Sequence, residues 1–220
     1  MNFHFETDSN NATLNPLRVP SKNATRATIE LPGINKLPSL MVLCEEGRME
    51  DVENFISNCD ASAPDNISLE EIINEPGNDK EGNPRTPLMV AVANEHSDIV
   101  EYLLDHGADT RIKNNRGSNA FHMAAYNVTD AYIMKILLEQ LYSSLSQSND
   151  DEMLEDYINQ KNKWDRTPLD FVHVRNIKFA KQNNVQTDMI LLLQKYGGKS
   201  NAYSKTGKYV GDGNGDLNSL

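Results

Sequence analysis

Long apolar runs are missing from this sequence. Among its 220 residues, no stretch comes close to the roughly 20 apolar residues that a membrane-spanning helix needs. The first residues, MNFHFETDSNNATLN, are polar and lack the apolar centre of a secretory signal. These two absences predict a soluble protein that makes no contact with a membrane.

Cysteine is scarce as well. Cys44 and Cys59 are too few for a disulfide framework, and nothing else in the sequence indicates an oxidising compartment. We therefore expect no disulfide between them and a buried thiol at Cys44. A reducing compartment favours a cytoplasmic location, and it leaves the nucleus and export into a host cell open as alternatives.

Patterns typical of catalysis are also absent. No glycine-rich phosphate loop follows a strand pattern, and neither a G-x-S-x-G motif nor a cysteine–histidine pair in a catalytic context occurs. His173 has no partner at metal-ligand spacing, and Leu217 stands where the calcium-loop pattern that begins at Asp212 requires glycine. We predict that the protein is not an enzyme and has no catalytic residues, metal or cofactor.

The most informative stretch that is present is RTPLMVAVANEHSDIVEYLLDHGAD, residues 85–109. Thr86 is a suitable N-cap, and Pro87 stands at the first helical position, where its missing N–H costs nothing. After a break at residues 94–96, Ser97 or Asp98 is expected to cap a second helix that ends at Gly107. Two short amphipathic helices cannot bury their apolar faces alone, so the pattern predicts one unit of a repeat protein.

Related segments stand on both sides of this unit. NNRGSNAFHMAAYNVTDAYIMKILL repeats its features at an offset of 33 residues, from Thr86 to Asn119. INQKNKWDRTPLDFV restarts the pattern at Thr167 and closes with MILLLQKYGG, whereas LPSLMVLCEEGRMEDVENFI is a weaker upstream copy. The offsets from Pro38 to Thr86 and from Asn119 to Thr167 are both 48, which indicates 33 residues plus an insertion each time.

These segments resemble the ankyrin repeat, whose 33-residue period and T-P-L-H-x-A signature they echo. The chain departs from the signature at Met89 and Asp170, which replace its histidine, and at Asn119-Ala120, which replaces Thr-Pro. The resemblance implies an all-α solenoid of about four helix-turn-helix units with short β-turn connections. It also implies structural roles for His96, His106 and His122.

The resemblance also divides the chain. We expect a repeat domain at residues 37–199, with units at 37–59, 79–109, 112–142 and 158–199 and insertions at 60–78 and 143–157. Residues 1–36 are expected to be mostly disordered and residues 200–220 to form a flexible tail, because both are polar and lack periodicity. Ser68 and Glu71 form a capping-box pattern that predicts a short helix in the first insertion. The second insertion is expected to lengthen a helix over residues 141–154 and to loop back through SQSNDDE.

Charge is unevenly distributed within a net charge of −11. Residues 41–83 hold twelve acidic side chains against two basic ones, and residues 139–156 hold six acidic side chains and no basic one. Residues 157–182 carry six basic side chains against two acidic ones. A partner would sense this distribution more than the total charge.

In ankyrin proteins the turns and first helices line a concave face that usually binds the partner. Carried onto this chain, the resemblance implies a basic and aromatic partner-binding surface with the residues Arg85, Arg116, Tyr126, Asn127, Lys163, Trp164, Arg166 and Arg175. Trp and Arg are residue types that dominate binding energy at interfaces. The alternatives remain open that Trp164 packs against its own chain and that the basic turns are merely solvated.

We therefore expect a non-catalytic protein–protein interaction module, an adaptor or regulator, that is monomeric in isolation and binds another protein through an acidic segment of that partner. The competing hypothesis is a ligand-binding or enzymatic site built from the insertions on a repeat scaffold. Nucleic-acid binding is not expected, because phosphate affinity needs clustered cations without nearby acidic blocks.

Overall fold

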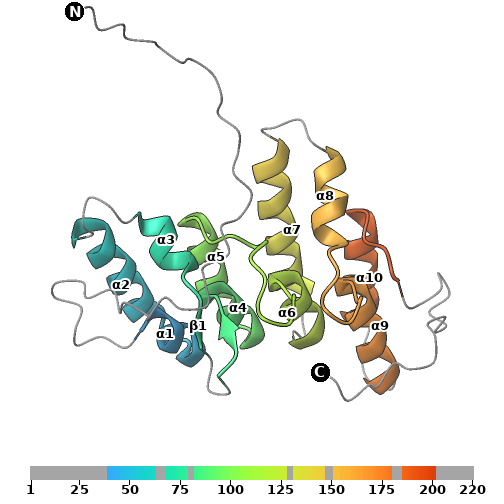
Figure 1. The fold of residues 1–220 in the computed structure, drawn as a ribbon, viewed down its shortest axis with the longest axis horizontal. Coiled ribbons are helices and arrows are strands. Elements are labelled where there is room, and N and C mark those ends of the chain that lie inside the picture. Colours follow the sequence, from blue (N-terminus) through green and yellow to red (C-terminus); the bar gives the residue numbers. More distant parts are fainter. Residues whose placement is uncertain are drawn as a thin grey trace, which may run out of the picture. The chain divides into compact units, whose positions relative to one another are not determined.

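The fold is built from stacked helix pairs. A computed structural model describes residues 39–62, 68–78, 82–127, 131–146, 151–179 and 185–201. Four pairs of helices follow one another along the chain: α1 (Leu40–Glu46) with α2 (Met49–Ser62), α4 (Pro87–Ala93) with α5 (Ser97–Asp105), α6 (Ala120–Asn127) with α7 (Ala131–Ser146), and α9 (Pro168–Phe179) with α10 (Val185–Lys195). The first helices contact one another in the order α1, α4, α6, α9, and the second helices α2, α5, α7, α10 form a parallel row (Figure 1). The predicted all-α repeat solenoid is confirmed.

Local sequence explains where the second pair begins and ends. The Thr86 hydroxyl accepts a hydrogen bond from the backbone N–H of Met89 at 3.2 Å, and Pro87 is the first residue of α4, as predicted. The prediction that Ser97 or Asp98 is the N-cap of α5 is wrong, because α5 begins at Ser97 and His96 holds the N-cap position without a side-chain capping bond. The Asp98 carboxylate, within the first turn, accepts from the Ile99 N–H at 2.9 Å. The chain turns sharply into α5 instead, through Glu95 at a φ of 61°.

Each pair buries an apolar stripe against its neighbours. In α5 the stripe consists of Ile99, Val100, Leu103 and Leu104, none of which is more than 3% exposed. Ala124 and Ala125 of α6 are fully buried, and their small side chains allow α4 and α9 to approach α6 closely. Burying each large aliphatic side chain contributes about 1.5–3 kcal/mol, so stability depends on the stacking of pairs.

Both cysteines lie in this core. Cys44 and Cys59 are buried and free, as expected from their scarcity. Burial raises the pKa of the Cys44 thiol to about 12, because a thiolate is poorly solvated there. The thiols therefore act as small apolar core groups.

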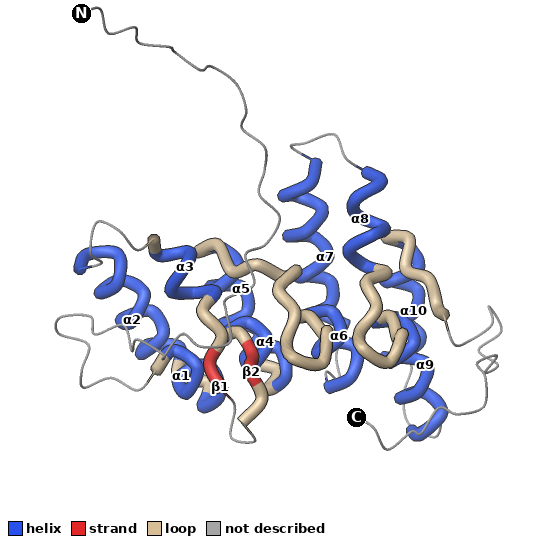
Figure 2. Tube along the Cα trace, in the orientation of Figure 1, coloured by secondary structure: helices blue, strands red, loops and turns tan. Residues whose placement is uncertain are grey.

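The first insertion contains α3 (Leu69–Asn74) and a short antiparallel pairing of β1 (Gly77–Asn78) with β2 (Pro84–Arg85), visible in Figure 2. The predicted capping box is confirmed: the Ser68 hydroxyl accepts from the Glu71 backbone N–H, and the Glu71 carboxylate accepts from the Ser68 N–H, both at 3.1 Å. In the second insertion α7 is lengthened as far as Ser146. Ser146, at the start of the predicted SQSNDDE loop, belongs to α7, and its last two residues, Asp151 and Glu152, belong to α8 (Asp151–Ile158); residues 147–150 lie outside the described residues.

Helices α3 and α8 occupy equivalent places in the repeat. At the end of each helix a buried isoleucine, Ile73 or Ile158, is followed directly by an asparagine. The Asn74 side-chain amide donates to the carbonyls of Glu70 and Gly107, both at 2.9 Å, and its oxygen accepts from the Asp109 N–H. Asn159 makes the same three contacts, with the carbonyls of Glu155 and Gly197 and the N–H of Lys199. Each asparagine therefore ties an inserted helix to the turn that ends the next helix pair.

The predicted division of the chain into units and tails stays a proposal. Residues 1–36 and 202–220 lie outside the described residues. Ser200 and Asn201, assigned to the tail by sequence, instead bind the Asp170 carboxylate through the Ser200 hydroxyl and the Asn201 N–H. Both residues therefore contact α9.

We expect Asn159→Ala to lower the free energy of unfolding by about 1–3 kcal/mol, because it removes three hydrogen bonds and leaves the carbonyl and N–H of a turn without their partner. Urea unfolding followed by circular dichroism measures this loss. Asn54→Ala, at an exposed position of α2, is the matched control and should change stability by less than about 0.5 kcal/mol. Equal effects of the two substitutions would contradict the assigned role of Asn159.

Candidate protein-binding groove

Two turns with the same geometry carry four of the eight predicted binding residues. In the first, the Asn114 side-chain oxygen accepts from the N–H groups of Arg116 and Ser118, at 2.9 and 3.0 Å. In the second, Asn162 accepts from the N–H groups of Trp164 and Arg166, at 3.0 and 3.1 Å. Arg116 and Trp164 therefore occupy corresponding positions of neighbouring turns.

The two turns are joined directly. The backbone N–H of Lys163 donates to the Arg116 carbonyl at 3.0 Å. Gly117 in the first turn has a φ of 74°, and the corresponding residue of the second turn, Asp165, adopts a similar left-handed conformation at 59°. The row of turns therefore holds Arg116 and Trp164 on a fixed backbone.

A buried polar side chain of α6 contacts the second turn. His122 is fully buried, and its Nε2 lies 3.1 Å from the Arg166 carbonyl oxygen. Its Nδ1 lies 2.6 Å from the Asn119 side-chain oxygen and 3.3 Å from the Asn119 backbone nitrogen. Burial lowers the pKa of His122 to about 4, so the imidazole is neutral near pH 7.

The other signature positions are filled differently. Met89 is apolar and buried, whereas Asp170 is a fully buried carboxylate that accepts from the N–H of Thr167 at 2.9 Å and from the N–H of Asn201 at 2.9 Å. The departures that the sequence showed at Met89 and Asp170 thus have different consequences. Met89 contributes apolar packing, whereas the Asp170 carboxylate holds the segment that follows α10 through its bond to the Asn201 N–H.

The remaining histidines also make structural contacts. His96 Nε2 lies 3.3 Å from the Glu45 carbonyl oxygen, and His106 Nδ1 lies 2.7 Å from that of Tyr102. Burial lowers the pKa of His173 as well. Within the described residues, no group of three or more His, Cys, Asp or Glu side chains is placed to hold a metal ion.

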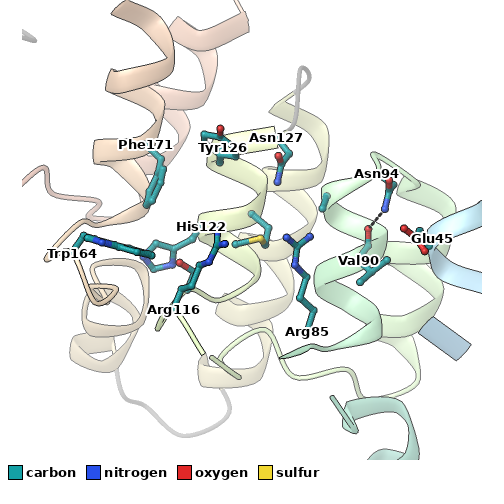
Figure 3. Close-up of a pocket in the computed structure, with 13 residues that line it drawn as sticks. Glu45, Arg85, Val90, Asn94, Arg116, His122, Tyr126, Asn127, Trp164 and Phe171 are labelled. Atoms are coloured by element: carbon teal, nitrogen blue, oxygen red, sulfur yellow. Dashed lines mark hydrogen bonds between the residues drawn. The ribbon is translucent and has the colours of Figure 1, made fainter. Parts of the chain in front are cut away.

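A groove of about 440 Å³ runs along the first helices, from α1 to α9 (Figure 3). The structure brings together in it five of the predicted binding residues: Arg85, Arg116, Tyr126, Asn127 and Trp164. Lys163 and Arg166 lie on the adjoining turn but do not line the groove. Arg175 belongs to α9, and its side chain is outside the described part of the chain.

Sequence reasoning missed several lining residues, namely Glu45, Val90, Asn94, His122, Met123 and Phe171. Val90, Asn94 and Met123 follow the inward face of α4 and α6, so helical spacing from Thr86 and Asn119 could have located them. Glu45 comes from the end of α1, and only the stacking of α1 on α4 places it near the groove.

Phe171 forms the apolar floor at the α9 end of the groove. Its ring is 4% exposed and meets the rings of His122 and Tyr126 edge to face, at centroid distances of 5.8 and 6.0 Å. Above this floor, Tyr126 is 38% and Trp164 42% exposed. Trp164 therefore does not pack away into its own chain.

Several cations away from the groove are ion-paired, although Lys195 on α10 forms no ion pair with any described residue. Arg48, Arg111, Lys135, Lys161 and Lys199 each form an ion pair with a nearby carboxylate. By contrast, Arg116, Lys163 and Arg166 form no ion pair with any described residue. The turns thus present uncompensated positive charge within a protein of net charge −11.

The stacked helix pairs, the asparagine-centred turns and the groove along the first helices define a repeat-type binding scaffold. Residues 40–149, half of the chain, match the family model for ankyrin repeats in three copies. The chain belongs to the ankyrin repeat family, whose members generally mediate protein–protein interactions and are generally non-catalytic.

A relative supports the same family. Over 55 residues, the chain is 33% identical to an ankyrin repeat protein of Rickettsia bellii. This match covers 25% of the chain but only 8% of the relative, so the chain spans a small part of the relative's length. Among the helices of the described segments, none has the length and apolar character needed to cross a membrane.

The buried state of His122 predicts a pH dependence of stability. His122 takes up a proton near pH 6.5 in the unfolded chain but only near pH 4 in the folded protein. The unfolded state therefore binds more protons between these values, and the free energy of unfolding should fall by about 3 kcal/mol as pH drops from 6.5 to 4.

The matched variant is His122→Met, since Met89 stands at the same place in the preceding unit. Urea unfolding at several pH values should show that this part of the pH dependence disappears in the variant, whatever its stability at pH 7. A variant that keeps the full dependence would show that other groups cause it.

Proposed function

We propose that this protein is a non-catalytic adaptor or regulator whose groove and adjoining turns bind an acidic segment of a partner protein. The main support for this proposal comes from three cations on the turns. Arg116, Lys163 and Arg166 form no ion pair with any described residue. Acidic side chains of a partner supply the compensating charge. The family's general role in protein–protein interaction supports this proposal.

The rigidity of the site supports recognition by a preformed surface. Both turns are closed by several hydrogen bonds around Asn114 and Asn162, and they are linked through Lys163 and Arg116. A surface that is already ordered loses little conformational entropy on binding. The partner segment bears most of the ordering cost.

The distribution of charge also supports directed association. The acidic side chains of the insertions repel an acidic segment, while the cations of the turns attract it. Such a field raises the association rate and does so less at high salt, because ions screen exposed charges beyond about 8–10 Å.

We further propose that the protein acts as a monomer in the cytoplasm, where a reducing environment keeps Cys44 and Cys59 free; a nuclear location or export into a host cell fits the same thiols.

A charge-reversal experiment tests this function. Arg116→Glu, Lys163→Glu and Arg166→Glu together should abolish capture of partners that the unaltered protein binds, and the remaining binding should lose its salt dependence. The control combines Arg48→Glu, Lys135→Glu and Lys195→Glu, which change the net charge equally. Arg48 lies between α1 and α2, Lys135 on α7 and Lys195 on α10, and none of the three lines the groove.

Quantitative mass spectrometry of the captured proteins, followed by direct binding measurements with the purified candidates, gives the readout. The expected partner is retained by the control and lost by the turn variant, and it carries an acidic segment whose deletion has the same effect. Partners that bind both variants equally well would rule out the turns as the binding surface.

A further inference from the structure

Besides its cations, the groove contains a cluster of three aromatic side chains, Trp164, Tyr126 and Phe171, which we call the aromatic seat. Binding of an acidic segment through charge alone would not require these rings. The rings of Trp164 and Tyr126 are both about two-fifths exposed, and both line the groove, with Phe171 buried at its floor (Figure 3). Exposure of large aromatic rings to water is unfavourable in the unbound protein. At this place they form an apolar site next to Arg116.

The seat is held in shape before anything binds. Tyr126 meets Phe171 edge to face, with an interplanar angle of 82°, and Phe171 is fixed from the other side by His122. The Trp164 backbone is held by its N–H bond to Asn162. Rings that are already positioned lose little freedom on binding, so the contact area converts efficiently into affinity.

The neighbouring groups decide which ligand fits. Arg116 holds the turn position that corresponds to Trp164, on the backbone directly bonded to the Trp164 turn, so a cation stands beside the seat. His122 beneath the seat is neutral, because burial lowers its pKa, and it adds no repulsion toward an apolar group. The site therefore suits a large apolar side chain with a carboxylate close by.

We infer that the groove binds its partner through one aromatic or large aliphatic side chain, which inserts between Trp164 and Tyr126 while a neighbouring carboxylate of the same extended segment pairs with Arg116. This inference rests on the proposed function and specifies its ligand. The apolar side chain is the anchor, and the surrounding acidic residues set orientation and rate of association.

A single-stranded nucleic acid is the competing occupant, because aromatic rings and arginine also bind stacked bases. The charge of the protein favours a peptide, because a net charge of −11 opposes a polyanion over longer distances. A short acidic peptide needs only the local cations.

Selection from a random peptide library displayed on phage, with the full chain as bait, tests the inference. Enriched peptides should contain an aromatic or large aliphatic residue within about three positions of Asp or Glu. Trp164 is the only tryptophan of the chain, so its fluorescence reports binding of the synthetic enriched peptide to the groove directly.

Substitutions then separate the anchor from the charge. Replacing the apolar residue of the peptide by alanine, or Tyr126→Ala in the protein, should weaken binding about tenfold or more, as truncation does at interface hot spots. Tyr142→Ala is the matched control, since Tyr142 is similarly exposed but lies on α7, and it should leave affinity unchanged. Arg116→Ala should weaken binding and reduce its salt dependence.

The outcomes distinguish this inference from the proposed function. Acidic peptides that bind equally well without an apolar residue would overturn the anchor and leave the proposed acidic partner intact. Enriched peptides without acidic residues would overturn both. Binding of a single-stranded oligonucleotide, lost in Tyr126→Ala and tighter than that of every enriched peptide, would assign the groove to nucleic acid and overturn both proposals.

Discussion

The register between neighbouring helix pairs depends on a few buried polar contacts, and the rest of the structure follows from that register. Apolar stripes supply most of the free energy, but they are non-directional and tolerate sliding. The contacts of His122 with the Arg166 carbonyl and of His96 with the Glu45 carbonyl cross between neighbouring helix pairs and admit only one arrangement of their partners. Buried polar groups must be satisfied, so a shifted stack would lose these contacts at a cost of about 1–3 kcal/mol for each unsatisfied group.

This register also places the groove. The bond from His122 to Arg166 sets the turn that bears Trp164 against α6, which bears Tyr126. The hydrogen bond from the Lys163 N–H to the Arg116 carbonyl then holds the turn that bears Arg116 next to the turn that bears Trp164. His122 thereby positions the side chains of Trp164 and Tyr126 along the groove.

Sequence reasoning was most successful where the determinants are local. Thr86 and Pro87 identify the start of α4 on their own, and Ser68 with Glu71 identifies that of α3, because caps depend on residues three positions apart. The start of α5 was assigned wrongly because Glu95 adopts a left-handed conformation that residue type does not announce. Repeat register located Arg116, Tyr126 and Trp164, since equivalent positions point the same way.

The parts of the site that sequence reasoning missed depend on contacts between units. Glu45 reaches the groove only because α1 stacks on α4, and no local pattern predicts that geometry. Phe171 looks like any apolar helix residue, and only the structure shows that its ring supports Tyr126. Arg166 illustrates the opposite error: its turn position is right, but its side chain does not line the groove while its backbone carbonyl holds His122.

Met89 has a mechanical consequence for the whole array. At this place the seam between α4 and α6 has an apolar side chain, whereas the corresponding place in the next unit carries His122 with its directional bond. Dispersion contacts change little when surfaces shift slightly, but a hydrogen bond resists displacement in several directions. The groove crosses both seams, so the resistance of its lining to a small shift depends on apolar packing at Met89 and on a polar contact at His122.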